Sequence, residues 1–372
     1  MSGDSLGGEK PIRVLLVGPS LEILGGQAVQ ARRLLTGLSE TEGVEVSFLP
    51  VNPRLPWPLQ LLRRIKYVRT VVTSIAYLGS LPPRLLRTDV VVAFSAGYWS
   101  FLLAPVPAIL LGRLLGRRVI LYYHTGEAED HLRRHGWFAK PLMRLAHRVV
   151  VPSDFLVEVF ARYGLVSISV ANFIEINTMP FRERTILAPR FLSNRNLEEL
   201  YNVPCTLRAF AAIQKELPNA VLIVAGSGSQ EQMLRRMVKS LGLDNVSFVG
   251  SVPPEQMGSL YDAADIYLNS PNIDNMPLSI IEALACGLPV VSTDAGGIPF
   301  VIRNEVNGLL VERNDDVGMA AAALRLLREP DLATCLTTTA RAEVVERYSW
   351  EAVGPQWHRV CRDLLGLTGP TR

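Results

Sequence analysis

Short runs of apolar residues alternate with longer stretches of helical apolar spacing along almost the whole chain. Each run is bounded by polar, glycine or proline positions, a pattern typical of strands buried on both faces of a parallel sheet. We predict strands at Ile12 to Val17, Val44 to Leu49, Asp89 to Phe94, Arg118 to Tyr123, Arg148 to Val151, Ser167 to Val170, Ala220 to Ala225, Val246 to Val249, Ile266 to Leu268, from Val290, and at Gly308 to Val311. The strand–helix alternation recurs in both halves and predicts an α/β protein with doubly wound sheets.

The chain has 372 residues. A single hydrophobic core rarely serves a chain of this length, so we expect two domains. Residues 175–189 are polar and proline-containing, like a linker, and we place the boundary between residues 180 and 181. The second domain, residues 181–349, is expected to begin with a loop from Arg190 to Asn202. A last helix starts at Tyr348-Ser349-Trp350 and runs to about Leu365.

Composition narrows the class of protein. Hydrophobic residues make up 48% and charged residues 20%, which describes a folded globular protein. The four cysteines are scattered without a C-x-x-C pair, so we expect a reduced, cytoplasmic protein, and the start of the chain does not resemble a signal peptide. The apolar region from Tyr98 to Leu115 is interrupted by prolines, a glycine and an arginine, and we predict a buried helix there instead of a membrane span.

Basic residues are concentrated in one part of the first half. Residues 51–120 hold ten lysines or arginines and one acid, Asp89. Within this part, Leu59 to Tyr77 has amphipathic helical spacing, and four cations (Arg63, Arg64, Lys66 and Arg69) lie mostly off the apolar side. Such a helix can lie on an anionic membrane surface, or it can be an ordinary helix with a solvated basic face.

The stretch from Asp265 to Pro299 carries the strongest signal for chemistry. It reads as strand, loop, short helix, strand and glycine-rich loop, with Pro277 suited to the first turn of the helix. Two carboxylates, Asp274 and Glu282, therefore fall at the carboxyl end of a parallel strand, which is where α/β folds bind ligands.

Other strand ends carry candidate ligand contacts. Glycines precede helices at Gly25-Gly26 and Gly226-x-Gly228, where backbone amides can approach a phosphate, although each is also compatible with a tight turn. His124 ends a strand before a glycine, and Arg190 and Arg195 lie in the first loop of the second half. His131 and His135 are four residues apart, but a third well-spaced zinc ligand is missing, so we expect no metal site.

These motifs resemble one family over nearly the whole chain: the retaining nucleotide-sugar glycosyltransferases of family 4, with the two-domain GT-B fold. Asn272 to Pro299 is similar to the family's E-x7-E segment and the G-G-I-P that follows. Val149 to Asp154 with Asn172 resembles its V-V-P-S and P-N elements. The resemblance implies two Rossmann-like domains facing a cleft, with the C-terminal helix, about residues 350–372, returning to the first domain.

The resemblance also implies roles for individual residues. Glu282 is expected to bind the donor ribose, Asp274 the transferred sugar, and Arg190 and Arg195 the diphosphate. Asp274 is shorter than the family's Glu, and Arg195 replaces its usual Lys. The remaining expected contacts are His124 near the sugar, Gly25 and Gly26 near the donor phosphates or the sugar, Gly226 and Gly228 at a strand end, Ser251 near the base, and Leu278 and Ser279 near the diphosphate.

The implied reaction is transfer of a sugar from a UDP- or GDP-sugar to an acceptor hydroxyl with retention, in cell-surface glycan or glycolipid synthesis. It needs neither cofactor nor metal, consistent with the lack of an Asp-x-Asp motif. The basic segment suggests a lipid-linked or anionic acceptor, with peripheral contact at the inner, anionic membrane face; nothing indicates nucleic-acid binding. Two alternatives stay open: a non-catalytic nucleotide-sugar-binding protein and an NAD-dependent oxidoreductase, although the glycine fingerprint of the latter is incomplete because position 231 is Glu.

Overall fold

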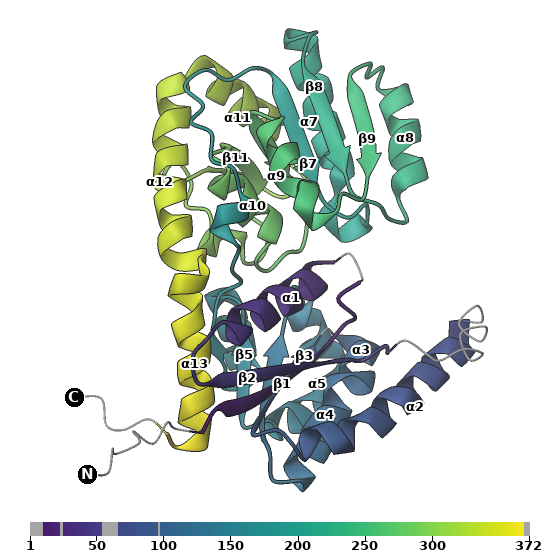
Figure 1. The fold of residues 1–372 in the computed structure, drawn as a ribbon. Helices are drawn as coiled ribbons and strands as arrows, with labels where there is room; N and C mark the ends of the chain where they lie inside the picture. Colours follow the sequence, from purple (N-terminus) through teal and green to yellow (C-terminus); the bar gives the residue numbers. More distant parts are fainter. Residues whose placement is uncertain (1–9, 23–24, 54–65, 96, 368–372) are drawn as a thin grey trace, which may run out of the picture.

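The computed structural model describes residues 10–22, 25–53, 66–95 and 97–367, which form two α/β lobes (Figure 1). The first lobe contains a parallel six-stranded sheet in the order β2-β1-β3-β4-β5-β6. Its strands are β1 (Ile12–Gly18), β2 (Val44–Pro50), β3 (Val90–Ser95), β4 (Arg118–Tyr123), β5 (Arg148–Val151) and β6 (Ile168–Ser169). The chain changes direction across the sheet between β1 and β3, and such a switch point leaves a crevice for a ligand at the carboxyl ends of the strands.

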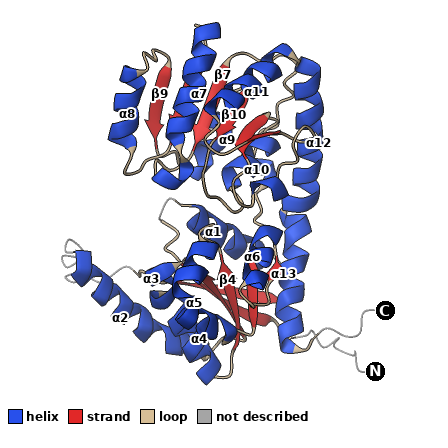
Figure 2. Ribbon diagram, turned by 180° about the vertical axis from the view of Figure 1, so that it is seen from behind, coloured by secondary structure: helices blue, strands red, loops and turns tan. Residues whose placement is uncertain are grey.

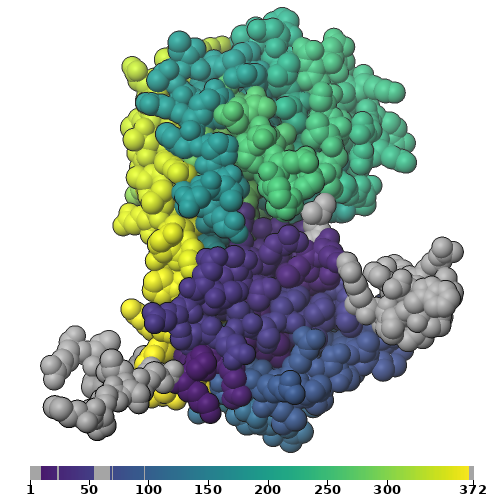
Figure 3. Space-filling view, viewed as in Figure 1, coloured from purple at the N-terminus to yellow at the C-terminus, as the bar shows by residue number. Residues whose placement is uncertain are grey.

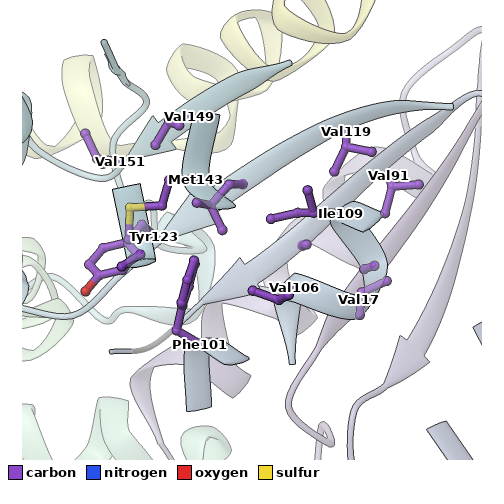
Figure 4. Packing of buried hydrophobic residues seen from close by; sticks show 14 of the residues in the cluster. Val17, Val91, Phe101, Val106, Ile109, Val119, Tyr123, Met143, Val149 and Val151 are labelled. Atoms are coloured by element: carbon purple, nitrogen blue, oxygen red, sulfur yellow. The ribbon is translucent and has the colours of Figure 1, made fainter. Parts of the chain in front are cut away.

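Alternate residues of the first sheet enter two separate hydrophobic cores. Leu15 and Val17 of β1 face one core, whereas Val14 and Leu16 face the other, as the two-residue period of a strand requires. The first core, part of which is drawn in Figure 4, is closed by α2 (Lys66–Leu85), α3 (Tyr98–Leu103), α4 (Pro105–Leu114), α5 (Ala128–Arg144) and α6 (Asp154–Arg162). The second core is closed by α1 (Gly26–Ser39) and by the C-terminal helix.

The second lobe repeats the design with the strand order β12-β11-β10-β7-β8-β9. Its strands are β7 (Arg190–Asn194), β8 (Val221–Ala225), β9 (Val246–Gly250), β10 (Ile266–Asn269), β11 (Val290–Thr293) and β12 (Leu309–Val311). The expected loop from Arg190 to Asn202 is therefore wrong, because its first five residues form a strand inside the sheet. Phe191 and Leu192 are fully buried there, but two apolar residues between an arginine and polar positions are too short a run to identify a strand.

Helices cover both faces of the second sheet and connect the two lobes (Figure 2). They are α7 (Val203–Glu216), α8 (Glu231–Ser240), α9 (Pro254–Asp262), α10 (Leu278–Ala285), α11 (Asp316–Arg328) and α12 (Pro330–Tyr348), with short 3-10 turns at Ile176–Thr178, Glu199–Tyr201 and Ile298–Phe300. Ser349 separates α12 from α13 (Trp350–Leu365) and accepts a hydrogen bond from the amide of Ala352. Val353 and Trp357 of α13 pack into the first lobe, which confirms the expected return of the C-terminal helix.

Two helical predictions in the first lobe need correction. The basic amphipathic helix expected at Leu59 to Tyr77 overlaps α2, which continues to Leu85; residues 54–65 lie outside the described part of the chain. Two prolines inside α2, Pro82 and Pro83, do not end the helix, since Leu81 and Leu85 beside them are fully buried in the core. The single buried helix expected at Tyr98 to Leu115 is two helices, α3 and α4, whose outer sides are exposed.

Candidate active site

The carboxyl ends of the two sheets face each other across a cavity of about 440 Å³ between the lobes. Figure 3 shows the lobes in contact, with the yellow C-terminal helices along one side of both. Lining residues from the first lobe include Gly25, Gly26, Arg33, His124 and Asn172; those from the second include Arg195, Tyr201, Gly226, Ser251, Asp274, Leu278, Ser279 and Glu282. Ten of the twelve predicted site residues thus line one cavity.

Gly25 and Gly26 lie where the chain enters α1, on the wall contributed by the first lobe. Gly25 is extended, with φ of −179°, so its backbone does not require a glycine. A Cβ atom built on either residue would meet no atom of the described residues within 4 Å. The two glycines therefore leave open space at a helix N-terminus, an arrangement that suits the approach of an anionic ligand.

His124 ends β4 on the same wall. Its amide donates to the carbonyl of Ser95 at 3.0 Å, and its ring is stacked on Phe94 and meets Tyr122 edge-on. Burial lowers the pKa of His124 to about 3, so the imidazole is neutral near pH 7. Its Nε2 atom is buried without a hydrogen-bond partner among the described residues, which leaves this nitrogen available to a ligand.

The opposite wall contains a buried ion pair. Arg195, directly after β7, places Nη2 on the carboxylate of Asp274 and donates from Nη1 to Ser279 Oγ at 2.9 Å. The guanidinium also lies 4.1 Å from the ring centre of Tyr201, a cation–π contact. Burial works against the charge, but the attraction of Asp274 raises the pKa of Arg195 above its ordinary value. A permanent cation is thereby fixed next to the start of α10.

Glu282 lies on α10, one turn into the helix, and is held at both carboxylate oxygens. Arg33 of α1 donates to Oε1 at 2.8 Å, and Tyr261 of α9 donates to Oε2 at 3.0 Å. Burial, together with the charge of Glu282, raises the pKa of Tyr261 well above its ordinary value, so this hydroxyl keeps its proton. The carboxylate therefore occupies a defined position in the cavity wall.

Gly226 and Gly228 differ in their position relative to the cavity. Gly226 lines the cavity with φ of +127°, and a Cβ there would overlap the carbonyl oxygen of Arg195. Gly228 is not among the residues that line the cavity; it packs against the carbonyl of Leu197. Close packing of two loops of the second lobe explains why position 228 is a glycine, and the donor contact of Gly228 stays a prediction.

Arg190 also lies away from the cavity. Arg190 is the first residue of β7, whereas Arg195 follows the last. Because a strand rises about 3.3 Å per residue, their Cα atoms lie roughly 16 Å apart. The Arg190 guanidinium is paired with Asp265 at 2.6 Å, at the amino end of the sheet. The predicted contact between Arg190 and the diphosphate is therefore wrong, because the assumed loop is a rigid strand that directs the two arginines to opposite edges.

Several contacts that build the site were not predicted. Arg33, Tyr261 and Tyr201 line or support the cavity, and two hydrogen bonds cross between the lobes, from Ser153 to Asn275 and from Asn172 Nδ2 to the Met276 carbonyl at 3.1 Å. The sequence did contain one indication that Arg33 belongs to the site. Arg33 is a charged residue at an inward position of an amphipathic helix, between Ala31 and Leu34.

Of the two histidines spaced four residues apart, His131 lies in the core of the first lobe. His131 is buried and its Nδ1 atom is 2.7 Å from the hydroxyl of Tyr123, while the ring of His135 lies 6.0 Å away. Within the described residues, no three His, Cys, Asp or Glu side chains gather as metal ligands would. Burial lowers the pKa of His131 to about 4, consistent with a neutral core histidine.

Comparison with known proteins identifies related sequences for both lobes. A model of the family described as Glycosyltransferase Family 4 matches residues 24–172, and one described as Glycosyl transferases group 1 matches residues 188–343. N-acetyl-alpha-D-glucosaminyl L-malate synthase of Bacillus anthracis is 31% identical over 207 residues, which are 53% of this chain and 54% of that protein. D-inositol 3-phosphate glycosyltransferase of Corynebacterium jeikeium is 31% identical over 194 residues, 50% of this chain and 45% of that protein. The matches span about half the length of these relatives.

Solved structures share the arrangement of the two lobes. Anabaena HepE in complex with UDP-glucose superposes with a TM-score of 0.73 and 17% identity, covering 95% of this chain and all of that one. Sucrose-phosphate synthase from Thermosynechococcus elongatus superposes with a TM-score of 0.70 and 18% identity, covering 97% of this chain and all of that one. At this level of identity the likeness shows the fold, which is GT-B.

Proposed function

Because the chain belongs to the family 4 glycosyltransferases with the GT-B fold, we propose that it transfers a sugar from a nucleotide-sugar donor to an acceptor hydroxyl. One observation carries the proposal. Arg195, the N-terminus of α10 and Glu282 follow one another along one wall of the cavity, opposite His124 and the Gly25-Gly26 turn. This order matches a diphosphate, which needs positive charge, next to a ribose, which needs hydrogen-bond acceptors.

The donor is proposed to be a UDP- or GDP-sugar. HepE, which has the same fold, is described in complex with UDP and with UDP-glucose, so uridine nucleotides are the first candidates. Gly226 and Ser251 line the part of the cavity formed by the ends of β8 and β9, where we place the base. Asp274, next to Arg195, is placed beside the transferred sugar.

In the proposed reaction the bond between the anomeric carbon and the diphosphate oxygen breaks, and the electron pair leaves with the diphosphate. Arg195 and the amides of α10 stabilise this developing negative charge without rearranging. The acceptor oxygen forms the new bond on the same face of the sugar and gives its proton to the departing phosphate, so the configuration is retained. The protein contributes fixed charge in this scheme, and we propose that no metal is required.

The acceptor is proposed to reach the cavity from the first lobe, carried on a membrane surface that this lobe contacts. Its helices α2 to α5 expose large apolar side chains, among them Trp99, Leu114 and Trp137 at 77%, 80% and 80% exposed. Exposed arginines accompany them, while the sequence from residue 66 to 118 holds a single acid, Asp89, which is paired with Arg13. None of the described helices is long and apolar enough to cross a bilayer.

These features support peripheral binding to anionic lipid and a lipid-linked or anionic acceptor, in cell-surface glycan or glycolipid synthesis at the inner membrane face. Sedimentation with vesicles containing phosphatidylglycerol at low salt tests the contact. We expect the L114E/W137E double variant to bind at least five-fold less than the wild type. The matched control is Ile186→Glu, at an 85% exposed position outside this surface. Wild-type protein that stays in the supernatant would exclude membrane binding.

The transferase proposal is tested by incubating the purified chain with UDP- and GDP-sugars. We expect a rise in Tm with one donor class, slow release of the nucleoside diphosphate, and a product whose anomeric configuration, read by NMR coupling constants, equals that of the donor. Glu282→Ala should lose both the Tm rise and the turnover. A Tm rise without turnover for any donor–acceptor pair would favour the non-catalytic binding protein, and a response to NAD alone would favour the oxidoreductase.

A further inference from the structure

The two lobes are joined inside the cavity by an ion pair between residues 249 positions apart. Arg33 belongs to α1 of the first lobe and Glu282 to α10 of the second, and Arg33 Nη2 lies 2.8 Å from Glu282 Oε1. Their side chains are only 8% and 10% exposed. Water therefore screens this pair far less than it screens a surface pair, and losing one partner leaves a buried charge without compensation.

The guanidinium of Arg33 is fixed at its other end as well. Its Nη1 donates to the carbonyl of Phe173 at 3.2 Å, and the same carbonyl accepts a hydrogen bond from Gln30 Nε2 at 2.7 Å. Arg33 therefore spans a backbone carbonyl and the Glu282 carboxylate with the two arms of one planar group. Lysine has one nitrogen and does not reproduce this geometry.

Glu282 retains acceptor capacity after these contacts. A carboxylate oxygen offers about two lone-pair directions, and here Arg33 occupies one on Oε1 while Tyr261 occupies one on Oε2. One direction remains on each oxygen. Two adjacent acceptors facing a cavity are the arrangement that the neighbouring hydroxyls of a ribose require.

We infer that Arg33 is a positioning residue that couples closure of the lobes to nucleotide binding at Glu282. The inference rests on the proposed function, since it takes the ribose of a nucleotide as the ligand of Glu282. When the lobes separate, Arg33 leaves with α1 and the carboxylate loses one of its two supports. The ribose site is then complete only in the closed form, so nucleotide and closure favour each other.

Calorimetric titration of UDP and GDP against four proteins tests this coupling: the wild type, Arg33→Met, Arg33→Lys and Arg32→Met. Arg32 is the neighbouring, exposed arginine of α1 and serves as the matched control. We expect Kd to rise at least ten-fold for Arg33→Met and by a smaller factor for Arg33→Lys, and to stay within two-fold for Arg32→Met. Small-angle scattering should show that UDP reduces the radius of gyration of Arg33→Met less completely than that of the wild type.

The outcomes separate the two proposals. If the wild type binds neither nucleotide, the proposed function fails. If the wild type binds but both Arg33 variants bind equally well, the positioning role is wrong. Tighter binding by Arg33→Met would also overturn it, because Arg33 would then be a competitor of the ribose. Should Arg33→Met fail to fold, Arg33→Lys decides, since it keeps the charge and changes only the geometry.

Discussion

Arg195 and Asp274 form a buried ion pair that joins the loop after β7 to the loop before α10. The Asp274 carboxylate also accepts the amide of Asn275 at 2.8 Å, and the Arg195 guanidinium also binds Ser279. The cation proposed for the diphosphate and the acid proposed for the sugar therefore fix each other's position. A change at either residue is expected to alter stability and donor recognition together.

Asp274→Ala is expected to lower the free energy of unfolding by about 3 kcal/mol, because it leaves Arg195 as an uncompensated buried charge. Asp274→Glu keeps the charge but moves the carboxylate by one methylene group, so we expect a smaller loss and a changed ratio of kcat/KM between donor sugars. Urea unfolding and a donor panel measure the two effects. An unchanged donor ratio in Asp274→Glu would remove Asp274 from sugar recognition.

Arg190, which begins β7, and Arg195, which follows its last residue, should behave oppositely. Arg195→Gln is expected to weaken UDP binding at least ten-fold, since it removes the buried cation proposed to bind the diphosphate. Arg190→Ala should leave the Kd for UDP within two-fold of the wild-type value and lower the free energy of unfolding by less than about 1 kcal/mol. Arg190 is 46% exposed, and its partner Asp265 is also held by Arg182 at 2.9 Å. Calorimetry with both variants checks this, and equal loss in the two would contradict the placement of Arg190 outside the site.

Gly226 should tolerate no side chain. Gly226→Ala combines a strained φ with overlap on the Arg195 carbonyl. We therefore expect the free energy of unfolding to fall by more than about 2 kcal/mol and nucleotide binding to weaken. The matched control is Gly242→Ala, where φ is +65° and no atom in the described part of the chain lies within 4 Å of the new Cβ. We expect this variant to lower the free energy of unfolding by about 1 kcal/mol. If the two variants unfold at the same urea concentration, the close approach at Gly226 does not matter.

His124 makes stability depend on pH. Its pKa of about 3 in the folded protein lies below the unfolded value of about 6.5, so the unfolded chain binds more protons between these values. The stabilisation is complete above pH 6.5 and is lost as pH falls towards 3, with a slope of up to about 1.4 kcal/mol per pH unit. His124→Asn should flatten this dependence. His131, with a pKa of about 4, contributes in the same direction, so a variant that lacks both histidines should show a smaller slope than either single variant. A single variant as steep as the wild type would show that His124 does not titrate in this way.

Much of the fold could be predicted because strand signals are local. The apolar runs that become β1, β3 and β4 are buried on both faces and need no partner to be recognised. β7 was missed for the opposite reason: Phe191 and Leu192 are a short run, and the ladder with β8 and β10 on either side stabilises the strand.

The same distinction applies to the site. Strand-end residues such as His124 and Asp274 were found because parallel strands deliver their carboxyl ends to one edge. Arg190 was assigned incorrectly because β7 was missed, and a strand of five residues separates its first residue from the site at its carboxyl end. Tyr261 was missed because its hydroxyl reaches Glu282 only after α9 and α10 pack together.

The sequence by itself determined the alternation of strands and helices in the two α/β lobes and the positions of most strand ends, since these depend on periodicity and on turns within a few residues. The return of the C-terminal helix was expected from the family resemblance. Tertiary structure alone decided which charges are paired. Arg33 reaches Glu282, and Ser153 reaches Asn275, across the gap between the lobes and across more than a hundred residues of chain. Such contacts depend on how whole lobes dock, and burial after docking is what gives them their strength.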